Sequence, residues 1–189
     1  EYYDFQLSVG ISEAVFDRAR RDIESIGMAF VDTLVSPGDG PGMSTVESRE
    51  AMRSIIRLLG RGYRFDSPDN SGTSLPRGAS EYVKALAERF GCSRIEMEDW
   101  VRHTMRRLAL LKNDDEWTLA TGREGLGLQV VAAGQSVWVC QRCSYRHLHG
   151  SAGICANVLC CNVGLREEPL SLDDSSKDYM SWLAHQRAS

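Results

Sequence analysis

The sequence predicts an α+β fold, in which a helical, winged-helix-like region is followed by a small zinc ribbon. Three observations predict it: capping residues open stretches with apolar residues at helical spacing, a β-patterned stretch comes next, and five of the six cysteines then fall within twenty-two residues. The 189 residues suit one or two small domains. A net charge of −4 argues against a protein that coats nucleic acid over its whole surface.

Residues 1–43 are expected to form a connecting segment of strand and helix. Aromatic and β-branched residues predict a strand over 2–9 and a second strand or extended segment over 28–35. Between them, Ser12 caps a predicted helix that Gly27 ends. The apolar face of this helix carries Val15, Ala19, Ile23 and Ile26.

Residues 44–134 are expected to form a winged-helix-like domain that opens with three helices. Ser44 and Glu47 make a capping box at the start of the first helix. After a polar loop, two more helices are predicted over 80–90 and 93–112. The inward-facing residues of the three helices are Met52, Ile55, Ile56, Leu59, Tyr82, Val83, Leu86, Phe90, Met97, Val101, Met105 and Leu108.

A β-hairpin is predicted over 115–131. Two β-patterned stretches flank the turn residues 121–125, which include two glycines. Three helices followed by a hairpin is the element order of a winged helix, in which the third helix would be the recognition helix for DNA. Other α+β domains share this order, so it does not by itself establish the fold.

The strongest chemical signal is the cluster of Cys140, Cys143, Cys155 and Cys160. The first two stand at C-x2-C spacing, at which a tight turn points both sulfurs at one metal ion. The second pair completes a structural zinc site of four thiolates with no open position for a reactive water. Cys161 is the alternate fourth ligand, and choosing it lengthens the spacing by one residue.

His147 and His149 are further alternates, since either can replace a cysteine of the second pair. Such a pair also suits a catalytic metal, but residues 150–154 supply no carboxylate as base, and the motif order of zinc deaminases is missing. Disulfides or buried free thiols are the structural alternative. Neither a P-loop nor a G-x-S-x-G motif occurs, so no catalytic residue is assigned in this segment.

Six arginines are candidates for contact with DNA: Arg102, Arg106, Arg107, Arg123, Arg142 and Arg146. The first three lie on the predicted helix 93–112, the fourth at the hairpin tip and the last two in the cysteine-rich segment. Residues 140–166 contain no Asp or Glu, so this segment is locally basic in an acidic chain. The structural alternative is that these arginines are solvated or pair with neighbouring acidic residues.

The zinc ribbon is expected over 135–168, and an acidic linker with a terminal helix over 169–189. The chain begins without a methionine, so we expect it to be a piece of a longer protein. No apolar run reaches membrane length, and no leader of charged and then apolar residues opens the chain. We therefore expect a cytoplasmic protein without a membrane partner.

The stretch 137–155, with its C-x2-C and H-x-H pairs, resembles a zinc-binding insert of very large bacterial superfamily 2 DEAD/DEAH-box helicases, of the kind found in anti-phage systems such as Druantia. Residues 4–8, 19–27 and 178–184 are similar to the same proteins. The resemblance implies that the cysteines act as metal ligands and that ATP and Mg²⁺ bind in motor domains outside this chain. A C-x2-C second knuckle would be expected there, and the longer spacing found here departs from that pattern.

The resemblance implies an accessory DNA-binding and scaffolding region of an ATP-dependent DNA helicase or translocase in anti-phage defence, with a structural zinc ion. Its partners would be DNA, the motor domains of the parent protein and other subunits of the defence system. The alternative is a protein-interaction module of a multi-subunit complex, which the acidic net charge favours. A metal-dependent hydrolase built on His147 and His149 is the weakest hypothesis.

Overall fold

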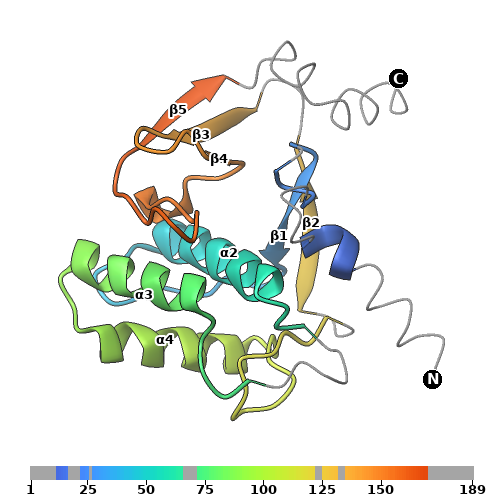
Figure 1. The fold of residues 1–189 in the computed structure, drawn as a ribbon. Coiled ribbons are helices and arrows are strands. Elements are labelled where there is room, and N and C mark those ends of the chain that lie inside the picture. Colours follow the sequence, from blue (N-terminus) through green and yellow to red (C-terminus); the bar gives the residue numbers. More distant parts are fainter. Residues whose placement is uncertain are drawn as a thin grey trace.

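The computed structural model shows an α+β fold in which α2 (Thr45–Arg61) is the central helix. It describes residues 12–16, 22–25, 27–65, 72–121, 125–131 and 135–169. Figure 1 shows α3 (Arg77–Phe90) and α4 (Arg94–Arg107) on one side of α2 and the strands of the cysteine-rich segment on the other. None of the helices in the described ranges is long and apolar enough to cross a membrane.

The three helices predicted from caps and apolar spacing are confirmed. Ser44 makes both bonds of the capping box at the start of α2, and the hydroxyl of Ser93 caps α4. α3 begins at Arg77 rather than at Ser80, and it ends at Gly91, whose φ of 71° is left-handed.

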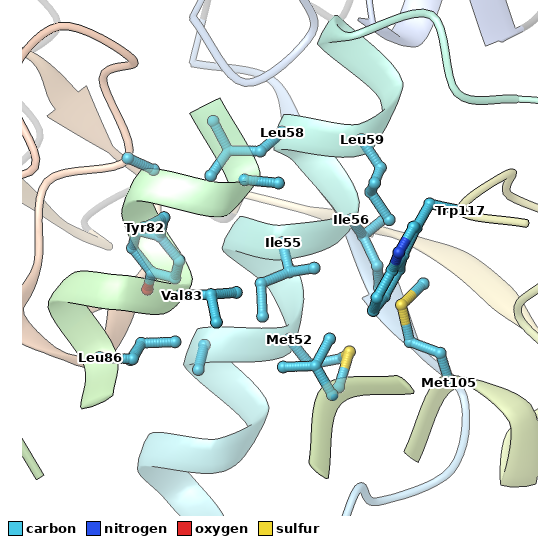
Figure 2. Packing of buried hydrophobic residues seen from close by; sticks show 14 of the residues in the cluster. Met52, Ile55, Ile56, Leu58, Leu59, Tyr82, Val83, Leu86, Met105 and Trp117 are labelled. Atoms are coloured by element: carbon cyan, nitrogen blue, oxygen red, sulfur yellow. The ribbon is translucent and has the colours of Figure 1, made fainter. Parts of the chain in front are cut away.

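The apolar stripes of these helices meet in the main core. Figure 2 shows side chains from α2 and α3 packed together, with Met105 and Trp117 against α2. Phe16, Val31 and Ile154 belong to the same core, so the connecting segment, the helical region and the cysteine-rich segment pack on one another. The largest side chains that are essentially inaccessible are Trp117, Tyr82, Phe65, Met52, Ile55, Ile56, Leu59, Leu86, Met97, Met105, Leu110 and Leu119.

α4 ends at Arg107 instead of continuing to residue 112. Ala109 has a left-handed φ of 53°, and the N–H groups of Ala109 and Leu110 turn back to the carbonyls of Arg106 and Met105. These two bonds form a Schellman motif, which usually has glycine at the left-handed position. An alanine there gives no signal in the sequence, so the predicted helix was too long.

The β-hairpin predicted over 115–131 is wrong. Its second half is strand β2 (Leu126–Val130), but β2 pairs antiparallel with β1 (Ala29–Thr33), which confirms a strand within 28–35. Val31 lies opposite Leu128 in this two-stranded sheet. The alternating residues of β2 were therefore read correctly as a strand, but their partner is distant in the sequence.

The first half of the expected hairpin is held by the segment after α2. The N–H of Trp117 donates to the carbonyl of Gly72, and the N–H of Leu119 donates to the carbonyl of Arg64. Leu119 also forms an isolated antiparallel bridge with Leu111. The backbone hydrogen bonds of Trp117 and Leu119 thus lead to the segment after α2 and not to β2, and the winged-helix identity of 44–134 stays a prediction.

The predicted helix that begins at Ser12 does not continue to Gly27. Residues 12–16 are helical, but residues 23–25 form a turn in which the Ser25 N–H donates to Asp22 Oδ1 at 2.7 Å. Gly27 does have a left-handed φ of 76°. The strand predicted over 2–9 lies outside the described residues.

The cysteine-rich segment contains a three-stranded antiparallel sheet. β3 (Ser136–Cys140) lies between β4 (Arg146–His147) and β5 (Leu165–Pro169). A 3-10 turn, η1 (Ser151–Gly153), joins β4 to the second pair of cysteines. β5 includes the first residue of the expected acidic linker, and the remainder of that linker with its predicted helix lies outside the described residues.

Candidate metal centre

Cys140, Cys143, Cys155 and Cys160 each bring one sulfur to a single place, where all four Sγ atoms lie within 4.8 Å of one another. The Sγ atoms of Cys140 and Cys160 are 3.8 Å apart, and those of Cys143 and Cys155 are 3.6 Å apart. Sulfurs placed tetrahedrally at about 2.3 Å from a zinc ion lie about 3.8 Å from one another. The residues and their spacing therefore fit a tetrahedral metal ion.

The first pair of cysteines is placed by the turn between β3 and β4. Ser144 has a left-handed φ of 57° and donates its N–H to the Cys140 carbonyl, while the Cys140 N–H donates to the carbonyl of Tyr145. Burial opposes ionisation of the Cys140 thiol, but hydrogen bonds from the N–H groups of Cys143 and Arg142 outweigh burial and lower its pKa to about 7. These N–H groups thus favour the thiolate that a metal ion requires.

The second pair is held by a loop that begins in the core. Ile154 is fully buried, and the N–H of Cys155 donates to the carbonyl of Asn162 at 2.9 Å. Asn157 donates its N–H to Cys155 Sγ and accepts the N–H of Cys160 at its carbonyl. Burial raises the pKa of Cys155 and Cys160, so a metal ion must displace protons from both thiols when it binds.

Cys160, and not Cys161, belongs to the sulfur cluster. Cys161 has a left-handed φ of 42°, and its side chain is directed toward the main core, where it is partly buried. Its Sγ lies 3.9 Å from the carbonyl oxygen of Asn157. The preference for Cys160 on spacing therefore agrees with the geometry.

His147 and His149, the other alternates, lie outside the cluster. His149 Nδ1 accepts a hydrogen bond from the Ser151 N–H at 3.1 Å, and its Nε2 lies 3.8 Å from Glu24 Oε1. His147 is fully buried, and neither of its ring nitrogens has a hydrogen-bond partner among the described residues. Burial, assisted by the charge of Arg57, lowers the pKa of His147 to about 3, so the ring is neutral at pH 7.

The α4 arginines predicted to contact DNA make contacts within the chain. Arg102 and Arg106 both donate to the backbone carbonyl of Asp114, at 3.0 and 2.6 Å. Arg107 donates to the carbonyl of Pro37. These bonds connect the end of α4 to two neighbouring loops and leave the three guanidinium groups less available to a phosphate.

The remaining candidates differ in their surroundings. The side chains of Arg142 and Arg146 are exposed on the cysteine-rich segment, whereas Arg123 lies outside the described residues. Arg166, in the same basic stretch, pairs with Glu168 on β5. The structural alternative of pairing with neighbouring acidic residues thus holds for Arg166.

A row of arginines on α2 was missed in the sequence. Four arginines recur at intervals of four residues, which places them on one face of the helix, and this spacing is a signal that could have been used. They are Arg49, Arg53, Arg57 and Arg61. Their acidic partners, which come from the connecting segment, are distant in the sequence.

Two carboxylates of the connecting segment pair with Arg57, whose side chain is 5% exposed. Its guanidinium nitrogens lie 2.9 Å from Asp22 Oδ1 and 2.8 Å from Glu24 Oε1. Burial opposes the ionisation of Asp22, but Arg57 outweighs burial and lowers the pKa of this carboxyl. For Glu24 burial is the larger effect and raises the pKa. Asp32 on β1 is bound in the same way by Arg49 and Arg53.

The cysteine-rich segment is hydrogen-bonded to α2 at η1. The N–H groups of Gly150 and Ala152 both donate to the carboxylate of Glu50, with Ala152 N at 3.0 Å from Oε2. A Cβ at Gly150 would lie 2.6 Å from Oε2 and closer still to Oε1, so any larger residue there would displace the Glu50 carboxylate from this position. Ser151 adds a hydroxyl contact of 2.6 Å with Ser54 and accepts the Tyr82 hydroxyl at its carbonyl. The four-cysteine cluster therefore lies beside a turn that is itself bound to the central helix.

Comparisons with protein-family models, with curated proteins and with solved structures found no match for this chain. The fold and the site define it as an α+β protein with four cysteines close enough to hold one metal ion.

Proposed function

We propose that the chain is an accessory, zinc-stabilised region that binds DNA and acts as a scaffold beside the motor domains of an ATP-dependent helicase or translocase. The observation that carries the proposal is the four-cysteine centre, because four thiolates leave a zinc ion no open position for a reactive water. Such an ion supports structure rather than catalysis. The link to a helicase of anti-phage defence rests on the resemblance of residues 137–155 to those proteins.

The cysteine-rich segment is the surface best suited to a nucleic-acid backbone. Arg142 lies in the first cysteine turn and Arg146 on β4, and both side chains are exposed. Residues 140–166 contain no acidic residue that would oppose a phosphate. Arg102 and Arg106 on α4 both donate to the backbone carbonyl of Asp114.

The salt dependence of DNA binding tests the proposal. Affinity for duplex and single-stranded DNA should fall as salt rises, because phosphate contact releases counterions. Replacing Arg142 and Arg146 with glutamate should weaken binding at least about tenfold and reduce the salt slope by about one per lost contact.

A matched variant with Lys84→Glu and Arg94→Glu makes the same change in net charge on exposed parts of α3 and α4. It should bind DNA nearly as the parent does. An affinity that is independent of salt, or an equal loss in both double variants, would count against a DNA surface on the cysteine-rich segment.

A protein-interaction module is the second candidate, and the second cysteine turn favours it. Leu159 is 88% exposed and Val163 is 52% exposed, on either side of Cys160. Neighbouring exposed apolar side chains often mark an interaction surface. Replacing Leu159 and Val163 with serine should then abolish binding to the motor domains of the parent protein while zinc content and DNA affinity stay unchanged. Unchanged binding to those domains would remove this candidate.

A further inference from the structure

We propose that the four-cysteine centre is a redox switch, in which hydrogen peroxide links Cys143 to Cys155 and the metal ion is released. This inference rests on the proposed metal centre. It goes beyond a structural role because it gives the site two states: in one the metal ion joins both cysteine turns through four sulfurs, and in the other a single Cys143–Cys155 disulfide joins them.

The four thiols differ in how easily an oxidant reaches them. Cys143 is exposed, Cys160 is half-buried, and Cys140 and Cys155 are buried. Cys143 stands in a turn whose residues 141–144 are all exposed. A small oxidant in solution therefore meets the sulfur of Cys143 first.

The sulfur of Cys155 lies 3.6 Å from that of Cys143, closer than the 3.8 Å between the sulfurs of Cys140 and Cys160. Asn157 contacts both members of the pair, since its side-chain Nδ2 lies 3.7 Å from Cys143 Sγ and its backbone N lies 3.4 Å from Cys155 Sγ. A disulfide needs an S–S distance of about 2.05 Å. The exposed turn that carries Cys143 can supply this movement, while Cys155 follows a fully buried Ile154.

The reaction balances with peroxide as the two-electron oxidant. The Cys143 thiolate attacks one oxygen of hydrogen peroxide, the O–O bond breaks, and hydroxide leaves to give a sulfenic acid. The Cys155 thiolate then attacks the Cys143 sulfur, an S–S bond forms and a second hydroxide leaves. Two thiolates are thus oxidised by two electrons, and one peroxide is reduced to two hydroxides, which become two waters on protonation.

Metal release follows because only Cys140 and Cys160 remain as thiolate ligands, fewer than a structural zinc ion requires. Cys140 ends β3, and Cys160 lies in the loop with the exposed Leu159. Cys160 then loses its metal-mediated link to Cys140 at the end of β3, while Cys155 stays anchored next to the core. Oxidation would therefore change the surface that residues 157–163 present.

The test uses the zinc-loaded full chain. The zinc content of the reduced protein is measured first, and a protein without zinc would overturn the metal centre itself. Peroxide is then added, free zinc is followed with a colorimetric chelator, and disulfides are mapped by mass spectrometry. We expect one zinc released for each Cys143–Cys155 disulfide, with rebinding after dithiothreitol and zinc.

Two control variants keep the test specific. Cys92→Ser and Cys161→Ser remove thiols outside the sulfur cluster and should release zinc as the parent does. Zinc that stays bound under peroxide would overturn the switch while leaving the metal centre intact. A disulfide between Cys160 and Cys161, or release with only sulfinic acids formed, would overturn the pairing.

Discussion

At the scale of single residues, the two adjacent cysteines have different roles. Cys160 contributes to the sulfur cluster, and Cys161 turns toward the core. Cys160→Ser should therefore abolish stoichiometric zinc binding, because a serine hydroxyl is a poor replacement for a thiolate. Cys161→Ser should keep one zinc per chain. Elemental analysis after gel filtration measures both, and equal zinc loss in the two variants would contradict this assignment.

His147 is a buried neutral residue whose effect depends on pH. Burial and the charge of Arg57 lower its pKa from 6.5 to about 3, and its ring makes an edge-type contact with the Tyr145 ring, with the ring centroids 5.1 Å apart. The unfolded chain therefore binds a proton below pH 6.5 that the folded chain does not. Between pH 6.5 and about 5 this residue alone should lower the free energy of unfolding by about 1.6 kcal/mol.

The variant His147→Leu isolates this effect, since Leu cannot titrate and the other titrating groups are shared by both proteins. Urea unfolding near pH 6.5 and near pH 5 should show a smaller decrease in the variant than in the parent. The variant should also keep its zinc, because His147 lies outside the sulfur cluster. Equal decreases would show that His147 titrates normally in the folded chain.

At the scale of elements, α2 connects the other parts of the fold. One face carries the apolar residues of the core, and another carries the arginines that bind Asp22, Glu24 and Asp32. Burying ions is costly unless they are paired, so these arginines position the connecting segment against α2.

Two arginine replacements compare the stabilisation from a buried ion pair with that from a more exposed ion pair. Arg57→Met leaves Glu24 buried without its close cation and Asp22 with only the longer pair to Arg61 at 3.5 Å, and should cost about 3–5 kcal/mol in the free energy of unfolding. Arg49→Met should cost less than about 1 kcal/mol, because Arg49 is 42% exposed and Arg53 still binds Asp32. Chemical denaturation at pH 7 measures both. Similar costs for the two variants would contradict the buried network.

At the scale of the whole molecule, removing the metal should destabilise the cysteine-rich segment while the helical region stays folded. The helices share a large apolar core to which the four clustered cysteines do not belong. The sheet of β3, β4 and β5, by comparison, packs only a small apolar cluster around Val137. A strong chelator should therefore leave the helical circular dichroism signal largely unchanged. Backbone amides of β3 and β5 should lose hydrogen-exchange protection, because binding energy of the metal stabilises so small a core. Loss of helix signal, or unchanged protection in β3, would contradict this view.

Local signals predicted the parts that depend on neighbours in the sequence. The capping box at Ser44 correctly predicted the start of α2. The spacing of Cys140, Cys143, Cys155 and Cys160 correctly predicted which four cysteines lie together. The end of α4 was not predicted, since Ala109 takes a conformation that favours glycine. The pairing of β2 was not predicted either, because its partner is almost a hundred residues away in the chain.

The sequence by itself thus determined the helices, their apolar faces and the four candidate ligands, since capping, periodicity and C-x2-C turns are short-range effects. Only the tertiary structure decided that β2 pairs with β1, that the α2 arginines bind Asp22 and Asp32, and that Arg102 and Arg106 donate to Asp114. The physical reason is that the edge of a strand, or a charged side chain, can pair with many different segments of the chain. The packing of the core selects among them.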